Sequence, residues 1–120
     1  MVKRGSKLGI SIGVDTELIS RFSMEKIHLY ANKFLSKDEL DYYNKLSDSK
    51  KQKFIASRFS AKEAIFKALG TGIDKIKFSE ITIIPNNRGK PIVYFDGYNI
   101  ELSISYNDLY VICFVILKEN

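Results

Sequence analysis

The segment RFSAKEAIFKALGTG, residues 58–72, carries an acid and a base one helical turn apart. Glu63 and Lys67 are separated by four residues, so a helix would place them on the same face. Gly70 and Gly72 flank a threonine directly after the helical pattern. Such a loop offers backbone N–H groups to an anion, and a nearby lysine adds a positive charge. The segment therefore indicates phosphate binding beside a carboxylate.

A second carboxylate, Asp15, ends the segment LGISIGVD, residues 8–15, which predicts a strand. Its apolar side chains alternate with Gly9, Ser11, Gly13 and Asp15, the period-two pattern of a strand. Because the second face is nearly bare, another element can approach its backbone closely. We expect a helix to pack there, beside Asp15.

Two carboxylates held together repel each other unless one is protonated or a cation lies between them. Mg²⁺ suits such a place, since one or two carboxylates, water and substrate phosphates complete its shell. Asp15 and Glu63 are therefore the candidate metal ligands. Lys67, Arg58 and the loop after Gly70 would bind the phosphates. The alternative for Glu63 and Lys67 is a surface ion pair worth about 0.3 kcal/mol.

Three helices are predicted between the first strand and the later strands. The first covers residues 16–34 and is amphipathic. The second opens with a capping box, Ser36 and Glu39. The third runs from Asp48 to Leu69, and Gly70 is its expected C-terminal stop. The expected inward positions of the first and third helices are Leu18, Phe22, Ile27, Tyr30, Phe54, Ile55, Phe59, Ala61, Ile65, Phe66 and Leu69.

Strand patterns return after the third helix. Residues 76–85 and 91–96 flank the turn NNRGKP, and the turn DGYN leads to residues 100–106. Residues 109–119 close the chain. One N-terminal strand, a helical block and an antiparallel four-strand meander predict an α+β fold.

Composition is typical of a soluble globular protein, with 45% hydrophobic and 28% charged residues among 120. We expect a single domain over residues 1–120, with residues 1–7 as a loose leader. No window approaches the roughly 18 apolar residues of a membrane span, so no membrane partner is expected. Cys113, inside an apolar run, is interpreted as a buried thiol, and His28 as a surface residue.

The net charge of +5 favours an acidic partner. A metal-dependent nuclease also combines acids, a lysine and a divalent ion. Such sites usually set the acid and the lysine on a strand, whereas here they lie four apart in a helical pattern. A nucleic-acid-binding module would need surface aromatics among basic residues. Here the aromatics fall mainly at core positions, so no nucleic acid is expected.

Taken together, the motifs resemble the 4'-phosphopantetheinyl transferase superfamily. GVD at residues 13–15, followed by RFSAKEAIFKALGTG, is similar to its signature G-x-D and then F/W-S/A-x-K-E-A-x-x-K. The resemblance extends from about Leu8 to Glu119 and is strongest to the short bacterial-type branch. It includes FLSKDELDYY, the turn ending in GKP and the late SIS.

The resemblance implies an enzyme of fatty acid biosynthesis that uses Mg²⁺. It would transfer the 4'-phosphopantetheine arm of coenzyme A to a serine of an apo acyl-carrier protein and release 3',5'-ADP. Asp15 and Glu63 match metal ligands, and Lys67 matches a lysine that contacts phosphate. Glu63, acting through a bound water, is the best candidate for the base that accepts the serine proton. Arg58 matches an arginine near the nucleotide's 3'-phosphate.

Other matched positions line the coenzyme pocket or meet the carrier. Gly70, Gly89 and Pro91 match pocket residues, and Arg21 matches an arginine that meets the carrier's acidic helix. Tyr106 departs from the family, which usually has histidine there. A tyrosine keeps a hydrogen bond but carries no positive charge, so we expect weaker coenzyme affinity or a changed pH profile.

The resemblance also implies a homotrimer with sites between subunits, because the longer branch holds coenzyme between two copies of the unit. Tyr106 and the turn at residues 88–91 would come from the neighbour of the chain that carries Asp15 and Glu63. The positive charge suits an acidic carrier protein. The expected location is the cytoplasm, or a plastid-like organelle if a targeting leader has been removed.

Overall fold

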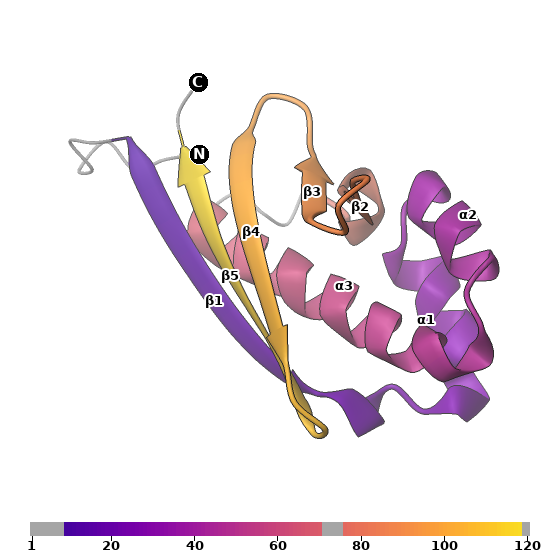
Figure 1. Cartoon of the computed structure of the whole chain (residues 1–120). Coiled ribbons are helices and arrows are strands. Elements are labelled where there is room, and N and C mark those ends of the chain that lie inside the picture. The colour runs from indigo at the N-terminus through magenta and orange to yellow at the C-terminus, as the bar shows by residue number, and fades with distance from the viewer. Residues whose placement is uncertain (1–8, 71–75, 119–120) are drawn as a thin grey trace.

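The computed structural model describes residues 9–70 and 76–118 and places the helices on one side of a curved sheet (Figure 1). The longest helix, α3 (Asp48–Leu69), crosses the sheet's inner face. Two short helices, α1 (Ile27–Phe34) and α2 (Lys37–Asn44), lie beside it. Within the described ranges, none of the helices is long and apolar enough to cross a bilayer.

The strands form two separate antiparallel sheets. β1 (Ile10–Leu18), β5 (Tyr110–Lys118) and β4 (Asn99–Tyr106) pair in that order in the large sheet. β2 (Thr82–Pro85) and β3 (Pro91–Tyr94) form a small sheet. The predicted α+β class and the order of elements are confirmed. The later strands divide into two hairpins, β2–β3 and β4–β5, rather than one continuous meander.

The helix predicted over residues 16–34 is wrong at its start. β1 continues to Leu18, because β5 offers pairing partners as far as Tyr110. Two short 3-10 turns follow, and the regular helix begins only at Ile27. Leu18, predicted to face inward, is 41% exposed, because alternation along the strand directs it to the outer face.

Most other local predictions are confirmed. Ser36 Oγ accepts a bond from Glu39 N at 3.2 Å, and Glu39 Oε1 accepts one from Ser36 N at 2.8 Å. Helix α3 ends at Leu69, and Gly70 takes a φ of 78° that favours glycine. The strand predicted over residues 76–85 is shorter than expected. Its first part forms the 3-10 turn Phe78–Glu80, and the strand begins at Thr82.

The core contains a fully buried ion pair that sequence reasoning missed. Lys62 Nζ donates to Glu39 Oε1 at 2.5 Å and to the carbonyl oxygens of Phe34 and Phe78 at 2.9 and 3.0 Å. Glu39 Oε2 accepts a bond from Ile83 N at 2.8 Å. Because these bonds compensate both buried charges, the pair ties α2 and α3 to β2.

Replacing Lys62 with methionine should therefore unfold the protein more easily. Lys62→Met leaves the Glu39 charge buried and unpaired, which costs about 3–5 kcal/mol of unfolding free energy. Urea unfolding followed by circular dichroism measures this change. Lys62→Met combined with Glu39→Gln should cost less than the single change, and exposed Lys45→Met should cost under about 0.5 kcal/mol. A Lys62→Met protein as stable as the parent would contradict this account.

Candidate functional site

The site begins where β1 crosses α3 at Gly13. A Cβ atom at Gly13 would lie 1.9 Å from the carbonyl oxygen of Ala64, so only glycine allows this approach. Two hydrogen bonds join the same elements: Ser60 Oγ donates to Asp15 O at 3.2 Å, and Ser11 Oγ donates to Ala68 O at 2.6 Å. The bare strand face predicted from the sequence is therefore the helix contact, as expected.

This contact places Asp15 among the charged side chains predicted to act with it. Lys67 Nζ lies 3.0 Å from Val14 O and 3.5 Å from Asp15 Oδ1. Burial and the charge of Asp15 raise the pKa of Glu63, against the opposing effect of Lys67. Asp15, Glu63 and Lys67 thus form one electrostatic group, which we call the carboxylate site.

Glu17 is a further carboxylate of this site that the sequence reasoning missed. It follows Asp15 by two residues in β1, so both side chains leave the strand on the same face. Burial and the neighbouring Asp15 raise the pKa of Glu17 to about 7, against a smaller effect of Arg21. The period-two alternation would have identified it if the predicted strand had continued past Asp15.

Arg21 lies at the rim of the carboxylate site and is partly exposed. Its Nη1 donates to Glu17 Oε1 at 2.5 Å, and its guanidinium lies 4.9 Å from the ring centre of Phe59. The residue belongs to a 3-10 turn rather than to the predicted helix. Its position leaves it able to meet a partner that approaches the site.

The residues of the carboxylate site fit a hard divalent cation. Asp15 Oδ2 is buried and accepts no hydrogen bond from the described part of the chain, which is costly for a charged oxygen. Burial and, after it, the neighbouring Asp15 raise the pKa values of Glu17 and Glu63, and a cation would oppose both effects. Within residues 9–70 and 76–118, no three or more His, Cys, Asp or Glu side chains form a metal cluster. The fit is therefore to an ion that keeps water or substrate oxygens as ligands, as Mg²⁺ does.

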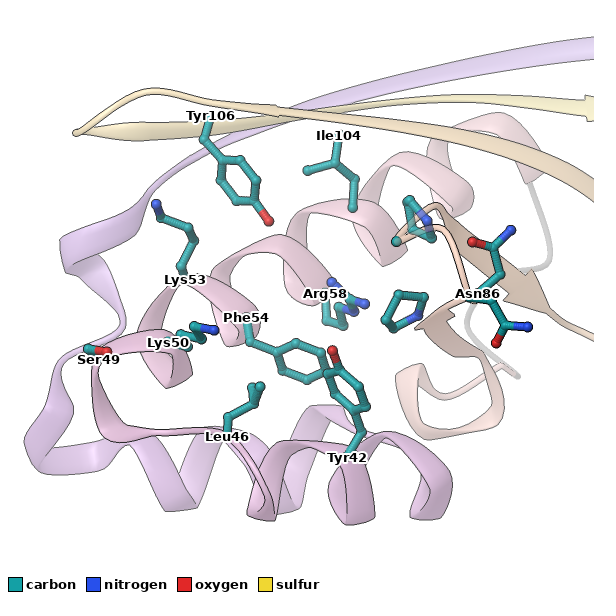
Figure 2. Close-up of a pocket in the computed structure, with 14 residues that line it drawn as sticks. Tyr42, Leu46, Ser49, Lys50, Lys53, Phe54, Arg58, Asn86, Ile104 and Tyr106 are labelled. Atoms are coloured by element: carbon teal, nitrogen blue, oxygen red, sulfur yellow. The ribbon is translucent and has the colours of Figure 1, made fainter.

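A pocket of about 730 Å³ opens on another part of the chain, between α2, α3, the β2–β3 turn and β4 (Figure 2). Lys50 and Lys53 are among its lining residues, and the lining within the described chain includes no acidic side chain. It is therefore suited to an anion. The predicted coenzyme residues that line it are Arg58, Gly89, Pro91 and Tyr106.

Arg58 is held rigidly in this pocket. Its Nε donates to Ile83 O at 2.9 Å, its Nη1 donates to Ser57 Oγ at 3.0 Å, and its guanidinium lies 4.2 Å from the ring centre of Phe54. Burial lowers the pKa of Arg58, and the charge of Glu39 opposes this effect. The fixed guanidinium presents a positive charge to the pocket without a large ordering cost.

The structure does not bring all the predicted site residues together within one chain. At 100° per residue, Glu63 and Lys67 lie about 140° and 180° around α3 from Arg58. Arg58 bonds to β2, whereas Lys67 bonds to β1, on the other side of the helix. Gly70 lies at the Lys67 end of α3 and is not a lining residue of the pocket. The rest of the predicted phosphate loop, residues 71–72, lies outside the described residues.

Two residues that the sequence excluded from chemistry behave as expected. Cys113 is fully buried in β5, and burial raises the pKa of its thiol to about 11. His28 is exposed, although its Nδ1 lies 3.2 Å from Tyr43 Oη. Neither takes part in the carboxylate site or lines the pocket.

Comparison with known proteins gives a consistent result. The family model of the 4'-phosphopantetheinyl transferase superfamily matches residues 11–115. A holo-[acyl-carrier-protein] synthase of Oceanobacillus iheyensis is 38% identical over 112 residues, covering 89% of this chain and 94% of the relative. One from Streptococcus suis is 45% identical over 93 residues, covering 75% and 77%.

Solved structures agree with the sequence relatives. The crystal structure of a holo-(acyl-carrier-protein) synthase from Bacillus anthracis, in complex with coenzyme A (3',5'-ADP), has a TM-score of 0.83 to this chain. The two are 31% identical, and the match covers 92% of this chain and 96% of that one. That protein therefore shares both the fold and a substantial part of the sequence.

Gly13→Ala should disturb the carboxylate site through the β1–α3 contact. The added methyl group would meet a backbone oxygen, so β1 must shift, at a cost of about 1–3 kcal/mol of unfolding free energy. Urea unfolding would show this loss, and exposed Asn32→Ala serves as a control with little expected effect. Unchanged stability in Gly13→Ala would mean that the contact is looser than described.

Proposed function

This chain belongs to the 4'-phosphopantetheinyl transferase superfamily, and we propose that it carries out the reaction of holo-[acyl-carrier-protein] synthases. The 4'-phosphopantetheine group of coenzyme A is transferred to a serine of an apo acyl-carrier protein in fatty acid biosynthesis. The observation that carries the proposal is the carboxylate site, where Asp15, beside Glu63 and Lys67, has a buried oxygen that accepts no hydrogen bond from residues 9–70 and 76–118.

Asp15 and Glu63 are the proposed ligands of Mg²⁺. The ion, when bound, supplies positive charge that offsets the pyrophosphate and the developing charge of the leaving group. Lys67 is exposed enough to leave Val14 O and bind a phosphate oxygen of the coenzyme. Arg21, beside Glu17, is the proposed contact for the acidic carrier protein.

The transfer requires a base for the carrier's serine. The serine oxygen forms a bond to the β-phosphorus of coenzyme A while the bond to the bridging oxygen breaks, and 3',5'-ADP leaves. We propose that Glu63 accepts the serine proton through an ordered water. Burial and the Asp15 charge raise the pKa of Glu63, whereas a bound cation would oppose this effect, which favours proton transfer through the water over direct removal by the carboxylate.

The carboxylate site and the pocket lie apart within one chain, which favours an assembly of several copies. Arg58 and Tyr106 line the pocket, whereas Asp15 and Glu63 lie on the other side of α3. We propose that the pocket of one chain meets the carboxylate site of a neighbour, in a homotrimer. One molecule of coenzyme A would then contact residues from two subunits.

The outer face of the large sheet is the surface we propose for this association. Its side chains on adjacent strands β1 and β5 include several apolar ones that are open to solvent in the single chain. Ile12 and Val14 are 61% and 53% exposed, and Ile112 and Phe114 are 48% and 40% exposed. An apolar patch that continues across two paired strands is typical of a protein interface.

Mass spectrometry of an apo acyl-carrier protein tests the reaction. Incubation with this protein, coenzyme A and Mg²⁺ should add one phosphopantetheine mass, and EDTA should abolish the gain. Glu63→Ala should slow the transfer at least about a hundredfold, because it removes a proposed metal ligand and base. Exposed Glu25→Ala is the matched control and should act as the parent does. Absence of transfer to several carrier proteins, or full activity of Glu63→Ala, would overturn the proposal.

Light scattering tests the trimer. The parent should show three times the mass of one chain, and Ile112→Asp should show a smaller mass because it places a charge in the apolar face. Leu29→Asp changes an exposed apolar residue of α1, outside this face, and should leave the mass unchanged. A parent protein that is fully active as a monomer would refute the shared site.

A further inference from the structure

Lys53 and Tyr106 form a contact at the mouth of the pocket that joins α3 to β4. Lys53 Nζ lies 5.0 Å from the centre of the Tyr106 ring. Both residues line the pocket, and Figure 2 shows them on its same side, with the Tyr106 hydroxyl directed inward. A lysine above an aromatic face at this distance is a cation–π pair. The ring therefore holds a positive charge at the pocket.

The charge of Lys53 completes a set of cations around the pocket. Arg58 supplies one that is buried and fixed by Ile83 and Phe54. Lys50, one turn before Lys53 in α3, supplies another. Three positive side chains line the pocket, and its described lining includes no acidic side chain, so its charge is complementary to that of a multiply charged anion. The pocket is therefore suited to a ligand with more than one phosphate.

Lys53 brings a positive charge next to the side chain at position 106. A tyrosine there brings no positive charge of its own. The ammonium of Lys53 lies over its ring and brings the charge to the same side of the pocket. Because the ring restrains a long flexible side chain, less conformational entropy remains to be lost when the ligand binds.

We propose that Lys53, positioned by Tyr106, is a specificity residue that recognises the phosphate monoester of coenzyme A. This inference rests on the function proposed above and assigns one residue pair within it. Lys53 contacts the 3'-phosphate together with Arg58, and the enzyme thereby distinguishes coenzyme A from its 3'-dephospho form. Lys53 belongs to substrate selection and takes no part in the transfer chemistry at the carboxylate site.

Calorimetry with two nucleotides tests this assignment. Adenosine 3',5'-bisphosphate carries the monoester, and adenosine 5'-monophosphate lacks it. Lys53→Met should weaken binding of the bisphosphate roughly tenfold and that of the monophosphate less than about twofold. Lys53→Arg should keep the discrimination. Lys33→Met is the matched control, because Lys33 Nζ lies 5.7 Å from the ring centre of Phe34, outside the pocket.

Substitutions of Tyr106 distinguish the contribution of its aromatic ring to binding from that of its hydroxyl group. Tyr106→Phe keeps the aromatic face and should keep most of the preference for the bisphosphate. Tyr106→Leu removes the face and should lose part of the preference, roughly threefold. In the transfer assay, Lys53→Met should raise KM for coenzyme A, leave kcat unchanged and leave the kinetics with dephospho-coenzyme A near those of the parent.

The outcomes distinguish this inference from the proposed function. If the parent transfers phosphopantetheine but Lys53→Met keeps its discrimination, the function stands and the role of Lys53 is refuted. Equal weakening of both nucleotides would also refute it, because it would show general attraction rather than recognition of one phosphate. If the parent neither transfers the group nor binds the bisphosphate, the function and the inference fail together.

Discussion

The contact between β1 and α3 at Gly13 determines where the chemistry of this protein lies. A side chain at Gly13 would enter the backbone of α3 at Ala64, so the strand reaches the helix only because this residue has none. The close approach sets Asp15 against Glu63 and directs Lys67 back to the strand. The close backbone contact at Gly13, which involves no charged group, therefore positions the charged side chains of the carboxylate site.

The charged residues on the two sides of helix α3 have different environments. Towards β1 it carries Glu63 and Lys67, where like charges are held together at an electrostatic cost. Towards β2 it carries Lys62 and Arg58, whose charges are satisfied by buried hydrogen bonds. The hydrogen bonds on the second side hold the helix in place, whereas the first side brings like charges together.

The carboxylate site and the pocket are complementary in charge. The carboxylate site has excess negative charge and fits a cation, whereas the pocket of Arg58, Lys50 and Lys53 fits an anion. A polyphosphate with a divalent ion requires both. Since α3 separates them within one chain, the proposed association of copies through the apolar outer face of the large sheet would bring them together.

The sequence by itself determined the features that depend on local periodicity. Alternation along the first strand and the four-residue spacing in the long helix placed Asp15 on the helix-facing side of the strand and Glu63 and Lys67 on one face of the helix, and the capping box located the second helix. These signals are carried by neighbours along the chain, so they can be read without the fold.

Only the tertiary structure decided the features that depend on distant partners. β1 extends to Leu18 because β5, almost a hundred residues later, supplies its hydrogen bonds, and this extension brings Glu17 into the site. The pairing of Lys62 with Glu39 and of Lys53 with Tyr106 joins residues from different elements. The spacing of residues along the chain does not predict such contacts. The same local patterns are compatible with many arrangements, and strand pairing and packing between distant segments select one of them.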